Sequence, residues 1–320
     1  MPVGVVGAGK LGYHHARLLR SQPDARLVGL YDAHPERAAE VARELEVPSF
    51  SSAAALFDQV AAAVIAVPTT AHAEVARPAL ERGVHLLIEK PLASSLAEAD
   101  EIVAAAERAG ALLATGHVER FNGALRACEP YLERPLFVES HRLAPFGPRG
   151  TDVAVVLDLM IHDIDLVLSL VGRPVLSVDA TGVPVLSRSV DIANARLNFD
   201  GGAVANITAS RVSLERMRKL RLFQRSGYLS LDLAAGRGEF LRLRPGALPA
   251  AGVSLADVVE RVPLAGDGTE PLRAELEAFL AAVRGEREVV VNGRDGRRAL
   301  AVALEIVEKT EAHVVDSAAT

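Results

Sequence analysis

A glycine-rich turn between a short apolar strand and a helix is the feature that most constrains this fold. Residues 2–6 predict a strand, the sequence GAGKLG follows, and a helix is predicted up to Ser21. In that setting Gly7 permits a tight turn, Gly9 lets a pyrophosphate approach the backbone, and Gly12 lets the helix pack closely on the strand. The phosphates then lie at the positive end of the helix. The start of the chain therefore predicts a dinucleotide-binding βαβ unit.

A second predicted strand, residues 27–31, ends at Asp32, twenty residues after Gly12. A carboxylate in this place accepts hydrogen bonds from the adenosine ribose hydroxyls of NAD. Asp32 could also cap the next predicted helix, residues 35–45, and the two roles are compatible. Its charge repels the 2′-phosphate of NADP, although Arg37 lies nearby in the sequence. The sequence therefore favours NAD and leaves NADP open.

The alternation of strand and helix continues to about residue 117 and predicts a doubly wound parallel sheet. Strands are predicted at 2–6, 27–31, 48–50, 62–67, 84–88 and 112–116, and helices at 11–20, 35–45, 52–58, 71–82 and 95–109. After Phe121 apolar and polar residues alternate in several segments, which predicts a mostly antiparallel sheet. Its strands are predicted at 136–143, 175–186, 190–199, 203–211, 219–224, 228–233 and 239–243.

The predicted fold class is therefore α/β plus α+β. We expect an N-terminal Rossmann dinucleotide-binding domain at 1–118 and a C-terminal domain with an open, mostly antiparallel sheet at 119–320. Two late helices, 271–284 and 295–313, close the chain, and the last of them could pack back on the first domain. The stretch 244–270 is rich in Pro, Gly and Ala and is predicted to be a mobile loop.

Composition limits the partners that this chain can have. At 320 residues it has room for about two domains, and its net charge of −6 gives no indication of a nucleic-acid-binding surface. Cys128 is the only cysteine, so no intramolecular disulfide can form. The N-terminus has no basic signal-peptide segment, and no apolar run approaches membrane-spanning length. We therefore expect a cytoplasmic protein without nucleic-acid or membrane partners.

The sequence Glu89-Lys90-Pro91 contains the first candidate catalytic residue. The chain has only four lysines among its 35 Lys and Arg residues, so arginine serves wherever a plain positive charge is enough. Lysine offers an ammonium group that can share a proton with a substrate oxygen. Lys90 follows the predicted strand 84–88 and so lies at the carboxyl end of a sheet strand, where open α/β sheets bind ligands. A lysine that merely begins a turn or helix before a proline is the structural alternative.

Residues 153–171 predict a helix that is apolar on all sides and therefore buried. Asp158, His162 and Asp165 lie at i, i+4 and i+7, which places them on one stripe of that helix. Burying these groups is costly unless they pair or face a wet cavity, so the stripe indicates a proton-transfer site. An Asp–His pair that only joins parts of the fold is one alternative. A metal site that includes Asp163 is another, and we predict no metal.

The order of these motifs resembles one known family. The chain carries GAGKLG at 7–12, VPTTAH at 67–72, GVHLLIEKP at 83–91, DLMIH at 158–162 and NGRDGR at 292–297, with GH at 116–117 before FN at 121–122. These segments resemble the glucose–fructose oxidoreductase, inositol dehydrogenase and rhizopine catabolism (Gfo/Idh/MocA) family over nearly the whole chain. Met160 and Gly123 depart from a frequent glycine and a frequent proline of the family pattern.

The resemblance implies an enzyme, an NAD(P)-dependent dehydrogenase that transfers a hydride between a nicotinamide cofactor and a secondary alcohol of a sugar. The family's catalytic lysine, acid and histidine map to Lys90, Asp158 and His162. Cofactor contacts are assigned to Gly7, Gly9, Lys10, Leu11, Gly12, Asp32, Pro68, Thr69, His72, Glu89 and Lys90. Substrate contacts are assigned to Asn122, Arg142 and Asp165, and Arg149 and Arg211 are further candidates for a substrate phosphate. His72 could equally be a helix-start residue, and Glu89 could be structural.

Three functional alternatives follow. The segments DLMIHDID at 158–165 and HVERFN at 117–122 resemble a branch similar to UDP-N-acetylglucosamine 3-dehydrogenases, which implies a UDP-N-acetyl sugar as substrate. A free-sugar or inositol dehydrogenase is the alternative enzyme. A non-catalytic NAD(P)-sensing regulator is the alternative of another class, and it would not need Lys90, Asp158 and His162 together. The resemblance also implies a cis peptide bond before Pro91 and a homodimer or homotetramer formed through the C-terminal sheet.

Overall fold

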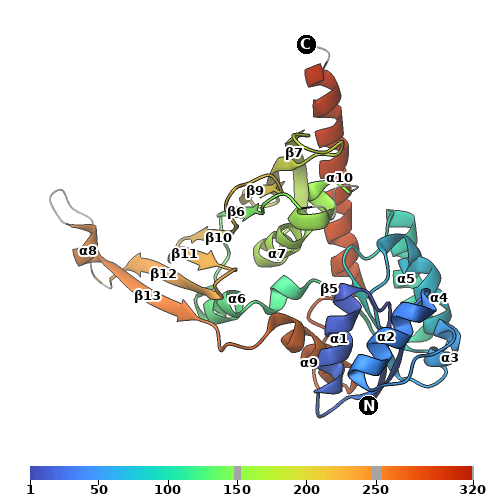
Figure 1. Ribbon diagram of the computed structural model, residues 1–320. Coiled ribbons are helices and arrows are strands. Elements are labelled where there is room, and N and C mark those ends of the chain that lie inside the picture. The colour runs from blue at the N-terminus through green and yellow to red at the C-terminus, as the bar shows by residue number, and fades with distance from the viewer. Residues whose placement is uncertain (148–152, 245, 247–253, 319–320) are drawn as a thin grey trace. The chain divides into compact units, whose positions relative to one another are not determined.

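The computed structural model describes residues 1–147, 153–244, 246 and 254–318 (Figure 1). Its chain divides into two compact units. The N-terminal unit comprises Met1–Val118 and Glu270–Leu300, and the C-terminal unit comprises Glu119–Thr269 and Ala301–Thr320. A late segment of the chain thus belongs to the N-terminal unit.

A five-stranded parallel sheet forms the centre of the N-terminal unit. Its strand order is β2-β1-β3-β4-β5, and all neighbouring strands run parallel. The central strands are almost fully buried, as expected for a parallel sheet covered on both faces. This confirms the predicted Rossmann fold. The strands are β1 (Pro2–Val6), β2 (Arg26–Tyr31), β3 (Ala62–Ile65), β4 (His85–Glu89) and β5 (Leu113–Gly116).

Two helices of this unit begin at a serine whose side chain caps them. Ser52 and Ser95 accept hydrogen bonds from backbone N–H groups in the first turns of α3 and α5. A late helix, α9, joins the same core, where Leu276 and Phe279 pack with Leu19 of α1. The helices are α1 (Lys10–Arg20), α2 (Pro35–Leu45), α3 (Ala53–Phe57), α4 (His72–Leu80), α5 (Leu96–Ala109) and α9 (Pro271–Val283), with a 3-10 turn η1 (Thr69–Ala71) before α4.

The parallel sheet gathers the predicted cofactor residues at one edge. Because all five strands run the same way, the residues that follow them leave the sheet at its carboxyl edge. β1 leads into Gly7, β2 into Asp32 and β4 into Lys90. β1 lies between β2 and β3, so the strand order reverses there, and this reversal is where open α/β sheets bind ligands.

An eight-stranded sheet forms the C-terminal unit, in the order β13-β12-β11-β10-β6-β9-β8-β7. β6 and β9 pair in parallel, and the other neighbours pair antiparallel, which confirms the predicted mostly antiparallel sheet. The strands are β6 (Phe137–Leu143), β7 (Val175–Val183), β8 (Ile192–Phe199), β9 (Val204–Ser210), β10 (Met217–Gln224), β11 (Gly227–Asp232), β12 (Arg237–Leu243) and β13 (Val259–Ala265).

Helical segments complete this unit. A π-helical turn, η4, leads directly into α7, which packs on β6 and β9. The final helix, α10, is long and crosses the boundary between the two units. Among the described residues, no helix is both long and apolar enough to cross a membrane. The segments are η2 (Val118–Phe121), α6 (Gly123–Cys128), η3 (Glu129–Tyr131), η4 (Val156–Met160), α7 (Ile161–Val171), α8 (Leu255–Val258) and α10 (Gly293–Ala318).

The stretch predicted as a mobile loop, 244–270, contains secondary structure, so that prediction was wrong for its described part. Residues 255–258 form α8, and residues 259–265 form β13, which pairs with β12. The strand contains Pro263, although proline cannot donate a hydrogen bond to a β-ladder. β13 is the outermost strand of the sheet, where proline is tolerated. α10 also begins earlier and ends later than predicted, and the short strand at 48–50 is reduced to a single bridge between Leu30 and Ser49.

The departure from the family pattern at Gly123 has a structural reason. Gly123 begins α6, and a β carbon there would lie 3.1 Å from the α carbon of Gly266. A β carbon at Gly266 would in turn lie 2.6 Å from the α carbon of Gly123. The two glycines therefore allow a close approach of two backbone segments that a proline would obstruct.

A buried ion-pair network joins α7 to the sheet of the C-terminal unit. Arg142 on β6 donates to Asp163 on α7, with Nε 2.5 Å from Oδ2, and to Glu119, with Nη1 2.9 Å from Oε1. All three residues are at most 6% exposed, and Ser140 also donates to Asp163. Burial opposes the charge of Arg142, but Asp163 and Glu119 outweigh it and raise the pKa of the guanidinium above its ordinary value.

We predict that Arg142→Met destabilises the protein by about 3–5 kcal/mol, because it leaves the buried Asp163 without its cation and removes the nearer of the two arginines that pair with Glu119. Arg221→Met is the matched control, since Arg221 pairs with Glu139 between β10 and β6 but is largely exposed. We expect about 1 kcal/mol or less for the control. Chemical denaturation would measure both changes, and equal losses would contradict the importance of the buried network.

Candidate active site

The glycine turn is closed by backbone contacts that exclude side chains. Gly7 has φ +98°, and a β carbon there would lie 2.5 Å from the carbonyl oxygen of Ala66. A β carbon at Gly12 would lie 1.8 Å from the carbonyl oxygen of Gly7. Gly9, by contrast, caps α1, and a β carbon there would meet nothing within 4 Å. The turn is therefore packed on its inner side and has open space beside Gly9, as a bound pyrophosphate requires.

Asp32 holds the peptide group at the middle of this turn. Its Oδ2 accepts the N–H of Ala8 at 2.6 Å, and its Oδ1 accepts the N–H of His34 at 2.8 Å. Arg37 Nε donates to the carbonyl oxygen of Ala8 at 2.8 Å, so both polar groups of Ala8 are fixed. Asp32 remains partly exposed. The turn and its acidic residue thus fit the dinucleotide site that the sequence predicts, with NAD as the cofactor.

Other predicted cofactor residues lie at neighbouring strand ends of the same unit. Lys10 and Leu11 form the first turn of α1, and the Leu11 side chain is 40% exposed. Pro68 follows β3 and precedes η1, which begins at Thr69. These positions follow from the parallel sheet, because β1 and β3 are adjacent strands that end at the same edge.

His72 is not a simple surface residue at a helix start. It is 1% exposed and begins α4. Its Nδ1 lies 3.0 Å from the carbonyl oxygen of Pro91 and its Nε2 lies 3.1 Å from that of Val67. Burial lowers the pKa of His72, although the surrounding carbonyl groups favour a proton. The imidazole thus connects the chain after β3 to the segment that follows Lys90.

Lys90 lies directly after β4 and is partly exposed. The peptide bond between Lys90 and Pro91 is cis, as the resemblance implies. The Lys90 N–H donates to Oε2 of Glu89 at 3.2 Å, and the Glu89 side chain is buried. The strand end therefore has a buried glutamate followed by a partly exposed lysine.

Asp158 and His162 lie in the C-terminal unit, whereas Lys90 lies in the N-terminal unit. Asp158 is in the π-helical turn η4, and His162 is in the first turn of α7. Both side chains are partly exposed within a helix whose other residues are mostly buried. π-Helical turns are rare and occur frequently at functional sites. The segment was predicted as one continuous α-helix over 153–171, and the structure instead places the π turn at Asp158.

The acidic residues that follow are paired inside the unit. Asp165, predicted on the stripe of Asp158 and His162, is 2% exposed and accepts from Arg120, whose Nε lies 2.6 Å from Oδ2. Asp163, predicted off the stripe, is 1% exposed and pairs with Arg142. Both pairs fix α7, which carries His162.

The remaining residues predicted to contact the substrate have partners inside the C-terminal unit. Asn122 is 4% exposed, caps α6 and donates to Glu119 and to the carbonyl oxygen of Leu233. Arg211 is 4% exposed and donates to Asp191, with Nε 2.8 Å from Oδ1. Together with the burial of Arg142, these contacts favour roles that support the site. Arg149 lies outside the described residues.

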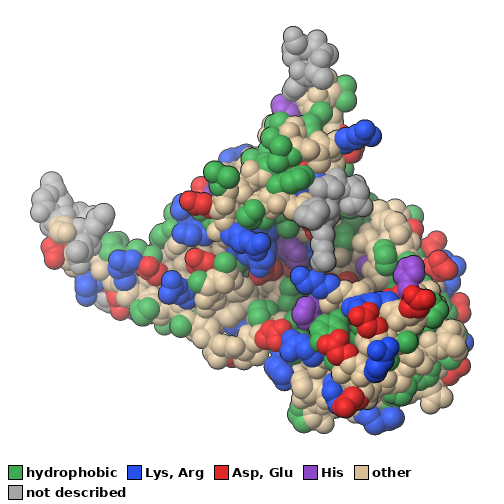
Figure 2. Space-filling view, viewed as in Figure 1, with side chains coloured by type: hydrophobic (Ala, Val, Ile, Leu, Met, Phe, Trp, Pro, Cys, Tyr) green, Lys and Arg blue, Asp and Glu red, His purple; other side chains and the backbone are tan. Residues whose placement is uncertain are grey.

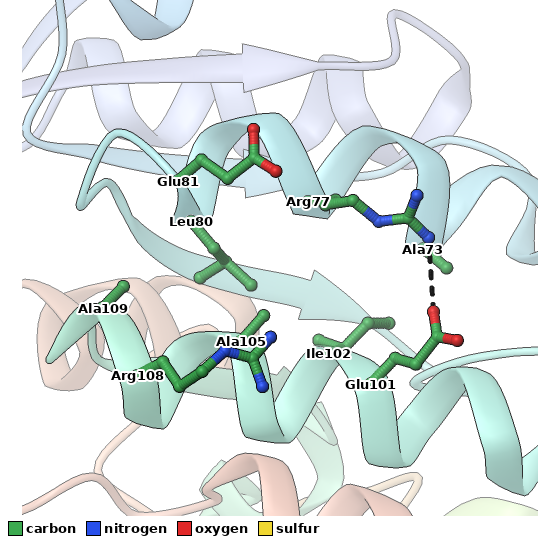
Figure 3. Close-up of a pocket in the computed structure, with 9 residues that line it drawn as sticks. All are labelled: Ala73, Arg77, Leu80, Glu81, Glu101, Ile102, Ala105, Arg108 and Ala109. Carbon is green, nitrogen blue, oxygen red and sulfur yellow. Dashed lines mark hydrogen bonds and ion pairs between the residues drawn. The ribbon is translucent and has the colours of Figure 1, made fainter.

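Surface features of the N-terminal unit do not mark a second cofactor site. Figure 2 shows positive and negative side chains mixed over its visible face. An open groove of about 580 Å³ lies between α4 and α5 (Figure 3). Leu80 and Ile102 line it, and Arg77 donates to Glu101 at 3.2 Å at one end. None of its lining residues is a predicted cofactor or catalytic residue, and we assign it no part in the reaction.

Two residues that lie beside the lysine strand were given no functional role by the sequence. His15 on α1 lies 2.7 Å from Glu89, measured from Nε2 to Oε1, and Glu275 on α9 is buried close to both. His15 could have been suspected, because it lies one turn after Gly12 on the apolar face of α1 together with Leu19. Glu275 carries no comparable signal, since α9 comes from a distant part of the chain.

Comparisons with known proteins agree with this geometry. The model for the oxidoreductase family with an NAD-binding Rossmann fold matches residues 1–117, and the model for the GFO/IDH/MocA C-terminal domain matches residues 132–230. The chain is 39% identical over 320 residues to UDP-N-acetylglucosamine 3-dehydrogenase of Acidithiobacillus ferrooxidans, covering 98% of both chains. It is 30% identical over 228 residues to scyllo-inositol 2-dehydrogenase (NAD(+)) of Bacillus subtilis, covering 65% of this chain and 67% of that protein.

Solved structures show the same relationship. The structure of the Acidithiobacillus ferrooxidans UDP-N-acetylglucosamine 3-dehydrogenase matches with a TM-score of 0.91 and 38% identity over 98% of each chain. Levoglucosan dehydrogenase in complex with NADH matches with a TM-score of 0.85 over 98% of each chain, and at 20% identity it shows the shared fold. The glycine turn, the strand order and these matches show that the chain belongs to the GFO/IDH/MocA family of oxidoreductases, with an NAD-binding Rossmann domain.

Proposed function

We propose that this oxidoreductase is an NAD-dependent dehydrogenase of a UDP-N-acetyl sugar and acts on a secondary hydroxyl of the sugar ring. The observation that carries the proposal is the similarity to a UDP-N-acetylglucosamine 3-dehydrogenase over 98% of both chains. The sequences EKP at 89–91 and DLMIH at 158–162 supply side chains that can hold an alcohol oxygen and accept its proton. An inositol dehydrogenase is the second candidate, because inositol dehydrogenases are also relatives.

The N-terminal unit has the residues needed to hold the cofactor. When bound there, NAD would supply the hydride acceptor for the oxidation of the carbinol carbon. The open side of the turn at Gly9 would hold the pyrophosphate, with the start of α1 behind it. Asp32 would accept from the ribose hydroxyls and would repel a 2′-phosphate. Arg37 is engaged with Ala8 and Glu40, which favours NAD over NADP.

The chain's own residues would move the proton and stabilise the charge. We assign Lys90 to the substrate oxygen, where its ammonium stabilises the negative charge that develops as the hydride leaves. His162 would accept the hydroxyl proton as general base. Asp158 would orient His162 or share its proton, since the π-helical turn η4 that carries Asp158 leads directly into the first turn of α7, which carries His162. The hydride and the proton are both accounted for in these steps without a metal ion.

We predict that Lys90→Ala lowers kcat at least about 100-fold, because it removes the cation at the reacting oxygen, while NADH still binds. Lys309→Ala is the control, since Lys309 is an exposed lysine on α10. Steady-state NAD reduction and NADH fluorescence titration would measure the two properties. Wild-type turnover in Lys90→Ala would overturn the assignment of Lys90.

We predict that the purified protein reduces NAD with UDP-N-acetylglucosamine, and that NADP is at least about tenfold less effective because of the Asp32 carboxylate. Other UDP-sugars, glucose and myo-inositol complete the panel. Absorbance of the reduced nicotinamide reports each reaction. Turnover only with a free polyol would contradict the nucleotide-sugar proposal and favour the inositol alternative. If the protein binds NAD but turns over none of these substrates, the result would favour the non-catalytic NAD(P)-sensing regulator.

We propose, further, that the protein is a homo-oligomer formed through the sheet of the C-terminal unit. One face of this sheet is buried and contacts α7, whereas the other presents polar pairs to solvent. Asn194 donates to Thr208 at 2.8 Å, and Arg196 donates to Asn206 at 3.2 Å, on neighbouring strands of that outward face. Such a broad ordered face is suited to a symmetric contact with a second copy.

We predict a particle mass of two or four times 33.8 kDa by light scattering coupled to size-exclusion chromatography. Asn194→Glu, which places a charge on the outward face, should shift the protein toward monomers, because a symmetric contact uses the same patch of both copies and so buries the added charge twice. Asp200→Asn, in the turn after β8, is the control. A monomer at micromolar concentration would contradict the proposed oligomer.

A further inference from the structure

A buried cluster of ionisable side chains lies beneath the strand end that carries Lys90. Its members are His15, Glu89 and Glu275, which are 0%, 7% and 2% exposed. They come from α1, β4 and α9, three elements of the N-terminal unit. One nitrogen or oxygen atom from each lies within 4.8 Å of the others. The mechanism proposed above uses none of these three groups directly.

Burying these ionisable groups costs free energy unless their charges are paired. Two carboxyl groups that are shielded from water repel each other unless a proton or a cation lies between them. His15 Nε2 lies 2.7 Å from Glu89 Oε1, so the imidazole can donate a hydrogen bond to this carboxyl group without a metal ion between them. Buried ionisable groups are weak evidence for stability alone, which points to a functional role for the contact.

The Glu89 carboxylate is held on several sides. Oε1 contacts His15, and Oε2 accepts the N–H of Lys90 at 3.2 Å. The carboxylate also lies against the backbone of Gly116, the partner of Glu89 in β5, where a β carbon would come within 3.0 Å of Cδ and Oε2. Rotation of this side chain would therefore break a contact with α1, a contact with Lys90, or both.

We propose that His15 is a positioning residue for Lys90 and acts through Glu89. The hydrogen bond from His15 fixes the carboxylate that accepts the backbone N–H of Lys90. His15 also belongs to α1, whose first turn follows Gly9, so the same contact ties the lysine to the helix behind the dinucleotide turn. Glu275 closes the cluster from α9. This inference rests on the proposed function, in which Lys90 acts on the substrate.

The matched variants His15→Gln and His15→Asn test this inference. The glutamine amide nitrogen can reach the position of Nε2 and donate to Glu89, whereas the shorter asparagine cannot. Both are neutral amides, so they differ mainly in reach. We expect His15→Asn to lower kcat by about 10- to 100-fold, because small misplacements of a catalytic group have effects of this size. His15→Gln should recover most of the wild-type kcat, and the KM for NAD should change less than about threefold in both.

Stability measurements separate positioning from a merely structural role. A structural role predicts a lower unfolding midpoint with an unchanged kcat per folded molecule, or equal kcat in the two variants. Either result would overturn the inference. His14→Asn is the control, because His14 is the neighbouring, partly exposed histidine of α1; it should retain wild-type kcat. If His15→Asn does not fold, Glu275→Gln replaces it, with exposed Glu277→Gln as its control, and unchanged kcat in Glu275→Gln would overturn the inference.

Lys90→Ala, measured beside these variants, distinguishes the two proposals. An inactive Lys90→Ala with a fully active His15→Asn would leave the proposed function standing and overturn the positioning role. An active Lys90→Ala would overturn the assignment of Lys90 itself. We expect both His15→Asn and Lys90→Ala to lose turnover while NADH binding remains measurable.

Discussion

The parallel pairing of β1 with β2 and β3 is the constraint on which the N-terminal unit depends. It sends the chain off the sheet at one edge after every strand, so Gly7, Asp32 and Lys90 reach that edge from three different strands. Backbone contacts then close the glycine turn so tightly that β carbons at Gly7 and Gly12 would collide with carbonyl oxygens. Strand order places the predicted cofactor residues at this edge, and the hydrogen bonds of Asp32 fix the peptide group in the turn.

In both units a buried, paired acid stands next to a candidate catalytic residue. Glu89 precedes Lys90 and contacts His15, and Asp163 follows His162 and pairs with Arg142. Each acid anchors the backbone from inside its unit, while the neighbouring lysine or histidine stays partly exposed. A side chain that must contact a substrate has to stay partly exposed and cannot be fixed by burial. The adjacent residue is buried instead and holds the backbone in place.

The sequence predicted features that depend on local pattern and missed those that depend on distant partners. The glycine turn, the parallel strands and the mostly antiparallel sheet followed from apolar periodicity and turn residues. Helical spacing put Asp165 on the predicted stripe of Asp158 and His162 and left Asp163 off it, yet both aspartates are buried and paired with arginines. The π turn η4 also breaks the regular α-helical spacing on which the predicted stripe depended. The contacts of His15 with Glu89 and Glu275 join residues far apart in the chain, which no local pattern reveals.

Deuterium transfer would test the central claim most directly. The protein would be incubated with NAD and UDP-N-acetylglucosamine that carries deuterium on the ring carbons with free secondary hydroxyl groups, and the reduced cofactor would be analysed by mass spectrometry. A direct hydride transfer predicts that deuterium appears in the NADH that forms. Unlabelled NADH would contradict hydride transfer from a secondary alcohol of the ring, and the absence of NADH would contradict this nucleotide sugar as the substrate.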